Sequence, residues 1–493
     1  MILSASLGLA LTEPTISDLA KSVSDTTTGL NVTWTLVAAF LVMFMQAGFA
    51  LVETGLTRAK NVAHTMGMNF FVYAIGILGF WAVGFALQMG GVGALGTLGG
   101  DATLSSEFTV HLFGTDFGLF GMKGFFLGGA TFTAPVAAMF LFQMVFMDTT
   151  CTIPTGAMAE RWKFTSFVIF SFVISTIIYP LYANWTWGGG WLSQLGKAFH
   201  LGHGHVDFAG SSVVHLTGGV MAFVGAKMLG PRYGKYGKDG SVKAIPGHNL
   251  PMVVTGTFIL AFGWFGFNAG STLAGNDLRT AVVAVNTMLA SAAGAFATYI
   301  VMMLKVGKPD VSMMCNGMLA GLVAITAPCA FVSAPASVLI GAISGVLVVY
   351  AALFVEHKLK IDDPVGAVAV HGVNGAWGVL SVGLFANGTY GEGLNGVDGP
   401  VRGLFYGDAG QLAASAIAIV VNILWVAPVA ALALTILKRT VGNRVAVEDE
   451  QMGLDEPEMG IPGYAAEPGQ QTIVAGGESP AGAPALVPER AAT

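Results

Sequence analysis

Two histidines are the residues of this sequence best placed to do chemistry. His215 and His371 lie in long apolar stretches that contain almost no other ionisable group, and each follows an aspartate, Asp207 or Asp363, by eight positions. An imidazole is costly to keep in hydrocarbon, so a histidine there marks a functional site, and its natural partner is the other histidine. Two neutral imidazoles share one N–H···N hydrogen bond and provide a polar track without a fixed charge.

The segments around the two histidines follow one pattern. They read DFAGSSVVHLTGG at 207–219 and DDPVGAVAVHGVNG at 362–375, and apolar, glycine-rich sequence follows both. Eight residues of helix rise about 12 Å, so each aspartate is expected at a helix entrance and each histidine well inside. Aspartate is a natural N-cap and its charge suits the positive end of the helix dipole. The sequence therefore predicts a structural repeat with one histidine in each copy.

Composition assigns the chain to the polytopic membrane proteins. Charged residues make up 10% of the sequence and the mean hydropathy is +0.70, whereas soluble domains carry about 25% charged residues. Apolar runs long enough to cross a bilayer predict eleven helices in an all-α fold. We place them near 33–57, 63–90, 122–147, 164–182, 208–229, 250–270, 280–304, 312–329, 335–355, 364–386 and 411–437.

The distribution of lysine and arginine predicts the orientation of these helices. Most basic residues, among them Arg161, Arg232 and Lys360, fall in one set of loops. The positive-inside rule then places the N-terminus outside and the C-terminus in the cytoplasm. The two histidine helices consequently enter from opposite sides and meet near the midplane. This arrangement is typical of an inverted repeat, here of five plus five helices with an added C-terminal helix.

The ends of the chain differ in composition from the core. Residues 1–32 are predicted to lie outside the membrane, and the apolar stretch 1–11 is compatible with a signal peptide although it carries no basic n-region. Residues 33–437 form the transmembrane domain. Residues 438–493 form a cytoplasmic tail that begins with an acidic segment and is predicted to be disordered toward its end.

Two further features have more than one interpretation. The histidines of the HLGHGH cluster, His200, His203 and His205, are interpreted as part of a solvated loop rather than a metal site, because no cysteine or carboxylate pattern beyond Asp207 accompanies them. Asp148 needs a proton, solvent or a partner inside an apolar region. The sequence leaves open whether it changes proton handling or anchors a neighbouring helix.

Several motifs together resemble the ammonium transporter family (Amt/Mep/Rh), and the likeness to its Amt-type members runs from about residue 33 to about residue 465. The motifs are GLTRAKN (55–61), FQMVF (142–146), GAMAERWKF (156–164), WGGG (187–190), DFAGSSVVH (207–215), HNLPMV (248–253), GWFGFNAGS (263–271) and DDPVGAVAVHGVNG (362–375). The resemblance implies an eleven-helix fold with a pseudo-twofold repeat, assembled as a homotrimer with one pore per subunit. Gly366 departs from the family, because many bacterial members have an acidic residue there.

The resemblance also implies an outer recruitment site. Trp187, Ser271 and Phe146, with Phe142 nearby, match the residues that hold an ammonium ion against aromatic faces, and Asp207 matches an aspartate that supports this region. A cation is attracted to an aromatic face by about 0.5–2 kcal/mol, and a hydroxyl oxygen accepts one N–H bond from the ion.

Below that site the resemblance implies a gate and a dry conduit. Phe146 and Phe267 match stacked gate phenylalanines, His215 and His371 match the paired histidines of the pore, and Trp264 matches a tryptophan that lines it. Burying an unpaired ion costs many kcal/mol, so ammonium is expected to release its proton near the gate and to continue as neutral ammonia.

The predicted function is therefore that of an ammonium transporter or channel in the cell membrane, with net ammonium uptake and methylammonium as an analogue substrate. The alternatives are an ammonium sensor (transceptor) sharing the fold, a Rh-like gas channel and, least favoured, an intramembrane enzyme. No nucleophile, metal triad or cofactor loop accompanies the histidines, so we expect no catalytic residue, metal, cofactor or nucleic acid. Besides lipid, the expected partner is a PII-type regulatory protein on the cytoplasmic face, where the basic loop 232–243 and the acidic tail 448–458 have complementary charge.

Overall fold

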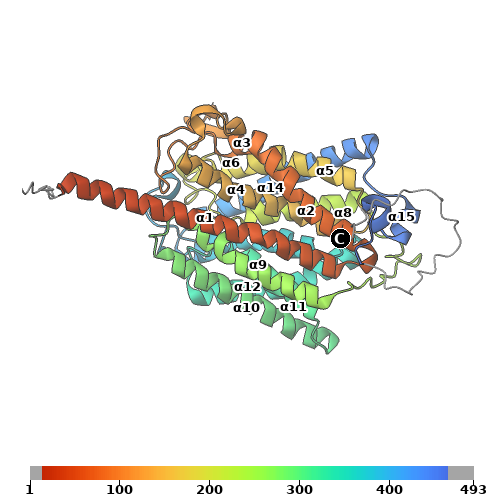
Figure 1. The fold of residues 1–493 in the computed structure, drawn as a ribbon. Helices are drawn as coiled ribbons and strands as arrows, with labels where there is room; N and C mark the ends of the chain where they lie inside the picture. The colour runs from red at the N-terminus through yellow and green to blue at the C-terminus, as the bar shows by residue number, and fades with distance from the viewer. Residues whose placement is uncertain (1–13, 465–493) are drawn as a thin grey trace, which may run out of the picture.

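A bundle of long helices forms the molecule. The computed structural model describes residues 14–464, so the proposed signal peptide at 1–11 and the last part of the tail lie outside the described residues. Within that range, ten helices are long and apolar enough to cross a membrane, and an eleventh apolar helix, Val311–Ile325, is shorter. The prediction of an all-α polytopic membrane protein is confirmed (Figure 1).

The first half of the bundle contains five membrane-length helical units, some of which include a π-helical turn. They are α1 (Ile16–Leu56), α2–α3 (Val62–Gly79 and Phe85–Met89), α4 (Ala134–Met158), α5–α6 (Phe164–Val173 and Tyr179–Trp187) and α8 (Thr217–Leu229) with its preceding π-turn Ser211–Leu216. The π-turns inside the second and fourth units are Phe80–Gly84 and Ile174–Ile178.

The second half contains six helical units, five of membrane length and the shorter α11. They are α9 (Leu250–Phe267), α10 (Arg279–Val306), α11 (Val311–Ile325), α12 (Ala334–Leu353) with the π-turn Phe354–Lys358, α13 (Asn374–Phe385) with its preceding π-turn Val368–Val373, and α14 (Ala409–Thr440). Short helical turns lie at Ala59–Asn61, Phe125–Leu127, Gly129–Thr131, Ala269–Thr272, Leu394–Gly396, Leu404–Tyr406 and Asp455–Met459.

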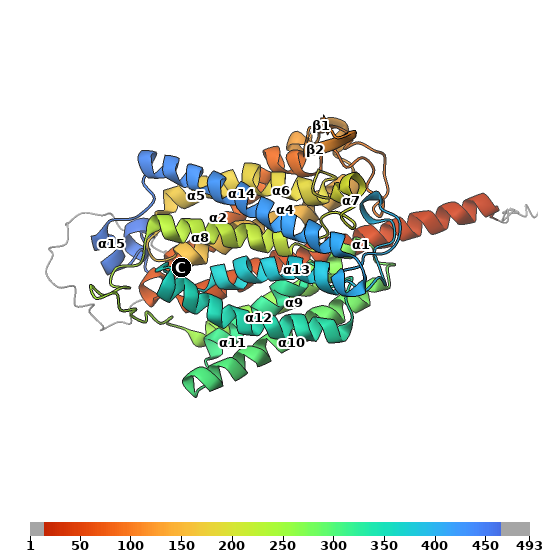
Figure 2. The same ribbon diagram turned by 180° about the vertical axis from the view of Figure 1, so that it is seen from behind.

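The two ends of the bundle carry different structures (Figure 2). One end, the hairpin face, carries the antiparallel pair β1 (Glu107–Leu112) and β2 (Thr115–Gly121) together with α7 (Leu195–Phe199). The other end, the tail face, carries α15 (Val447–Met452). The hairpin is an exposed connection and does not alter the helical fold class.

Two helices begin at places that hydropathy did not predict. α1 begins at Ile16 rather than near residue 33, because Thr15 and Asp18 form a capping box and helical structure continues through polar sequence beyond the bundle. α4 spans 134–158 rather than 122–147: Thr133 caps it, Pro135 fits its first turn, and the preceding segment is bent at Gly124 with φ +96°. Its threonine-rich end is buried against other helices, which hydropathy does not detect.

Candidate functional site

Both histidine segments are built from the same local structure. Asp207 accepts hydrogen bonds from the backbone N–H groups of residues 210–213, and Asp363 accepts them from residues 366 and 368. Gly210 and Gly366 have positive φ (+112° and +79°), and each precedes the π-helical turn that contains the histidine. In both copies glycine is the residue type that this backbone conformation favours.

The two copies run in opposite directions and cross at their glycines. Asp207 lines a cavity on the hairpin face, whereas Asp363 lines a cavity on the tail face. At the crossing, a Cβ on Gly219 would lie 2.2 Å from the backbone nitrogen of Gly372. Any side chain at Gly219 would therefore push the two segments apart.

The crossing brings the two histidines together. The Nδ1 atoms of His215 and His371 are 3.2 Å apart, and their rings are stacked at 5.2 Å with an angle of 25°. Since one Nδ1 must donate and the other accept, the pair shares a single hydrogen bond. Nε2 of His215 has no partner among the described residues. Both side chains are buried, so the pair offers ring nitrogens inside an apolar interior.

An aromatic stack lies between the histidines and the hairpin face. The rings of Phe146 and Phe267 are 4.1 Å apart at 23°, and Phe142 packs 4.7 Å from Phe146. Phe267 in turn lies 5.4 Å from the ring of His215. All three phenylalanines are buried, so the stack separates the histidines from the cavity above it.

Trp264 is held against the same histidine. Its ring stacks 5.3 Å from His215, and its Nε1 donates to the hydroxyl of Thr326 at 3.0 Å. The indole is thus fixed as an apolar wall beside the imidazole, and its N–H is not available to a passing molecule.

A cavity of about 240 Å³ opens on the hairpin face above the stack. Trp187, Ser271, Asp207 and His205 are among its lining residues. Trp187 Nε1 donates to the carbonyl of Asp207 at 2.7 Å, which fixes the indole 5.9 Å from Phe146. The Ser271 hydroxyl donates to the carbonyl of Phe267 at 2.7 Å, so its oxygen remains able to accept.

The interpretation of the histidine cluster as a solvated loop is wrong for two of its three members. His200 is exposed, but His203 and His205 are buried. Nε2 of His205 lies 2.8 Å from the hydroxyl of Ser212, which itself donates to Asp207 at 2.6 Å. Burial lowers the pKa of His205 to about 4. Polarity suggested a solvated loop, and the covering segment that excludes solvent comes from the distant residues 395–411.

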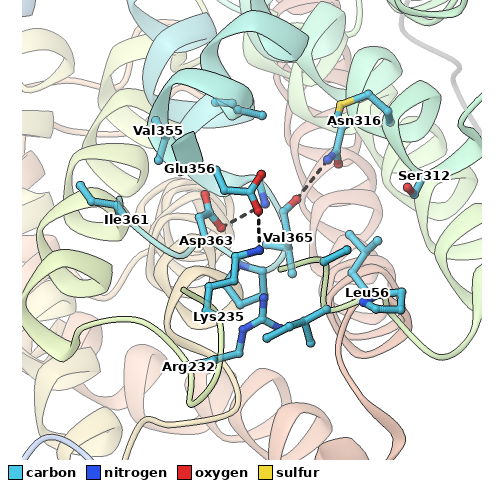
Figure 3. A pocket seen from close by; sticks show the side chains of 18 of the residues that line it. Leu56, Arg232, Lys235, Ser312, Asn316, Val355, Glu356, Ile361, Asp363 and Val365 are labelled. Atoms are coloured by element: carbon cyan, nitrogen blue, oxygen red, sulfur yellow. Dashed lines mark hydrogen bonds and ion pairs between the residues drawn. The ribbon is translucent and has the colours of Figure 1, made fainter. Parts of the chain in front are cut away.

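Two cavities lie on the other side of the histidines. A small one is lined by Phe49, Glu53, Asn316 and His371, among others. A larger one, about 290 Å³, opens on the tail face and is lined by Asp310, Asp363, Arg232, Lys235 and Glu356 as well as Asn316 (Figure 3). Both cavities share Asn316 and Val365, so they adjoin. Glu53 was not identified from the sequence.

The tail face is held by buried ion pairs. Arg232 pairs with Glu160 and with Asp362, and all three side chains are buried. Burial alone would raise the pKa of a carboxyl, but hydrogen bonds and charge from Arg232 outweigh it and hold the pKa of Asp362 well below its usual range. These contacts fix the loop that leads into the second histidine segment.

The acidic tail lies on this face, although not mainly on the basic loop. Glu450 pairs with Arg444 and accepts from the backbone of Tyr233. Asp455 and Glu458 accept backbone N–H bonds from His64 and Phe164. Lys235 of the basic loop pairs with Glu356 instead.

Comparison with known proteins gives matches over most of the chain. Residues 33–464 match the Ammonium Transporter Family model. The chain is 46% identical to the ammonium transporter Amt2 of Archaeoglobus fulgidus, covering 87% of each protein, and 38% identical to Amt1 of Haloferax mediterranei, covering 88% of this chain and 79% of that one. Among solved structures, a sensor Amt protein matches with a TM-score of 0.76 and 35% identity over 88% of this chain and 100% of that one. Candida albicans Mep2 matches with a TM-score of 0.69 and 27% identity over 85% of this chain and 87% of that one.

Proposed function

Because the chain belongs to the ammonium transporter family, and is thus a multi-pass ammonium transporter rather than an enzyme, we propose that it recruits ammonium on the hairpin face and conducts it as ammonia past His215 and His371. The observation that carries this mechanism is the 3.2 Å contact between the two imidazoles directly behind the stacked pair Phe146 and Phe267.

Recruitment is assigned to the cavity on the hairpin face. Trp187 and Ser271 line this cavity. The indole presents an aromatic face to a cation, with Phe146 and Phe142 packed next to it, and the Ser271 oxygen accepts one of the ion's N–H bonds. Asp207 supports the site and does not contact the ion. Its carboxylate oxygens accept hydrogen bonds from backbone N–H groups and from the Ser212 hydroxyl, and its backbone carbonyl orients Trp187. A Rh-like gas channel is less consistent with this cavity, because a neutral gas does not need aromatic cation binding.

Conduction is assigned to the segment between the gate and the tail face. The stacked rings of Phe146 and Phe267 leave no solvated route for an ion. The two histidines behind them are buried and bond to each other rather than to a charged side chain. An ion in this segment would lose its hydration without replacement, whereas ammonia accepts or donates hydrogen bonds along the imidazole edges. The proton is therefore released before the gate and crosses separately from ammonia, so that net uptake is of ammonium and carries a current.

The proposal also covers the orientation of the chain in the membrane, its assembly and its regulatory partner. The basic loop 232–243 and the acidic tail lie together on the tail face. This supports the proposal that the tail face is cytoplasmic and that the N-terminus and the recruitment cavity are outside. The subunit is proposed to assemble as a homotrimer. A PII-type protein is proposed to bind the tail face, where the acidic tail already packs against the mouth-forming loops.

The test is a measurement of ammonium-evoked current in proteoliposomes that contain the purified protein. We expect current on addition of ammonium and of methylammonium, none with an equal concentration of potassium, and none in protein-free vesicles. A sensor is the second candidate, because one structural neighbour is a sensor Amt protein. Saturable ammonium binding without current would favour the sensor and overturn transport.

A further inference from the structure

The carboxyl of Glu53 lies at the exit of the conduit, beneath the second histidine. Its side chain is 3% exposed, and it lines the small cavity that His371 and Phe49 also line. We propose that Glu53 protonates ammonia as it leaves the conduit and holds the resulting ammonium ion at an inner cation site. This inference rests on the proposed function, since it assigns the step that follows conduction.

The position of the cavity makes it the first polar environment after the histidines. The ring of Phe49 lies 6.1 Å from that of His371, and the remaining wall is largely apolar. The cavity shares Asn316 and Val365 with the larger cavity that opens on the tail face; both residues are labelled in the view of that larger cavity (Figure 3). A molecule that passes His371 therefore meets Glu53 before it reaches the open mouth.

A network of neutral side chains fixes the carboxyl in place. Asn69 Nδ2 and Thr155 Oγ1 both donate to Oε2 at 2.7 Å, so neither bond uses Oε1. Asn69 is itself oriented by the Thr152 hydroxyl at 2.8 Å. Gly156 leaves room for the carboxyl, because a Cβ there would lie 3.0 Å from Oε1. The glutamate is thus held by α2 and α4 while it borders the cavity.

The electrostatic surroundings favour a cation beside this carboxyl. The titratable groups that face it are His371 and Asp363, and the other lining residues of the cavity are neutral. Asp363 already accepts two backbone N–H bonds. A buried carboxylate without a cation is costly, so formation of ammonium next to Glu53 supplies the charge that the site lacks.

The proposed step balances in protons. The carboxyl O–H bond of Glu53 breaks and an N–H bond forms on ammonia, which gives a carboxylate and an ammonium ion. The ion leaves through the open mouth with water. Glu53 then regains a proton from the water of that mouth, so the group is restored after each passage.

A purely structural role is the competing explanation, because Glu53 also joins α1 to α2 and α4. Glu53→Gln separates the two roles. The glutamine oxygen still accepts from Asn69 and Thr155, whereas the amide neither donates a proton to ammonia nor balances a cation. Glu53→Asp has the reverse properties, since it keeps the carboxyl but shortens its reach.

The experiment compares currents of the wild type, Glu53→Gln and Glu53→Asp in proteoliposomes at several internal pH values. Glu107→Gln is the matched control: it is another carboxyl whose oxygens are buried, on β1 of the hairpin face, and it lines neither inner cavity. We expect Glu53→Gln to lower the maximal current at least tenfold and to lose the dependence on internal pH. Half-saturation should change less than twofold, Glu53→Asp should retain part of the current, and Glu107→Gln should match the wild type.

Two results would overturn the assignment. One is a Glu53→Gln variant with wild-type current and internal pH response; the other is a Glu53→Asp variant that is impaired while Glu53→Gln is not, which indicates a structural role. If Glu53→Gln fails to fold, the Asp variant alone decides: retained current with a shifted internal pH response supports the proposal, and an unshifted response contradicts it. A wild type without ammonium current would instead refute the proposed function itself.

Discussion

Removal of the aromatic face or of the hydroxyl from the recruitment cavity should weaken ammonium binding without blocking conduction. In Trp187→Leu the ion loses a ring that is fixed by the carbonyl of Asp207 and lies 5.9 Å from Phe146. A cation–π contact contributes about 0.5–2 kcal/mol, depending on desolvation. A loss of about 1 kcal/mol in this solvent-connected cavity raises the half-saturating ammonium concentration about fivefold.

Ser271→Ala removes a different contact from the same ion. The Ser271 hydrogen is already donated to the carbonyl of Phe267, so only its oxygen interacts with ammonium. A hydrogen bond that involves a charged group contributes about 1.5–3 kcal/mol, and competition with water in an open cavity reduces this to about 1 kcal/mol. We again expect about a fivefold rise in half-saturation.

The assay is the concentration dependence of the ammonium-evoked current in proteoliposomes. Trp81→Leu serves as the control, because Trp81 is partly exposed, packs on Phe126 and is not among the lining residues of the cavity. Maximal current should stay within about twofold of the wild type in both site variants. Unchanged half-saturation in both would refute recruitment at this cavity, and so would a fall in maximal current alone.

Three further predictions concern the crossing, the tail face and the partner. Gly219→Ala forces a methyl group against the backbone of Gly372 and should destabilise the protein by about 1–3 kcal/mol. We expect a lower melting temperature in detergent, and an unchanged melting temperature would disprove the prediction. Asp362→Asn should reduce stability at pH 7. The pKa of Asp362 is lower in the folded state than in the unfolded state. Its contribution to the free energy of unfolding is therefore present above the unfolded pKa of about 3.9 and is lost as the pH falls below it. A difference in melting temperature between the variant and the wild type that does not shrink below about pH 4 would contradict this. A PII protein from the same organism should bind the purified transporter in a nucleotide-dependent way and inhibit its current, and the absence of a complex with ATP, ADP and 2-oxoglutarate would remove that partner.

The sequence predicted the paired histidine segments because their signal is local. The spacing of Asp207 to His215 and of Asp363 to His371 predicted two helical turns, whereas the structure has a short non-helical segment followed by a single π-helical turn. In both copies the aspartate nevertheless accepts backbone N–H bonds at the start of that turn, as the pattern predicted. The pattern occurs twice, with an odd number of helices between the copies, so the two histidine helices were predicted to cross the membrane in opposite directions and to bring their imidazoles together. The Nδ1 atoms of the two imidazoles lie 3.2 Å apart.

Features that depend on distant parts of the chain were missed. The end of α4 is too polar to score as a membrane helix, yet it is buried because Thr155 and Thr152 bond to side chains of α1 and α2. Glu53 belongs to the same network, and nothing in its sequence neighbourhood places it below His371. His205 looked solvated because the segment that covers it follows almost two hundred residues later.

Replacement of the two histidines tests the central claim most directly. His215→Leu and His371→Leu keep an apolar conduit of similar size but remove the imidazole nitrogens that face each other at 3.2 Å. We expect each variant to remain folded and to change what crosses, with ammonium current reduced or discrimination against potassium lost. Wild-type ammonium current together with wild-type exclusion of potassium in both variants would contradict conduction of ammonia past the histidine pair.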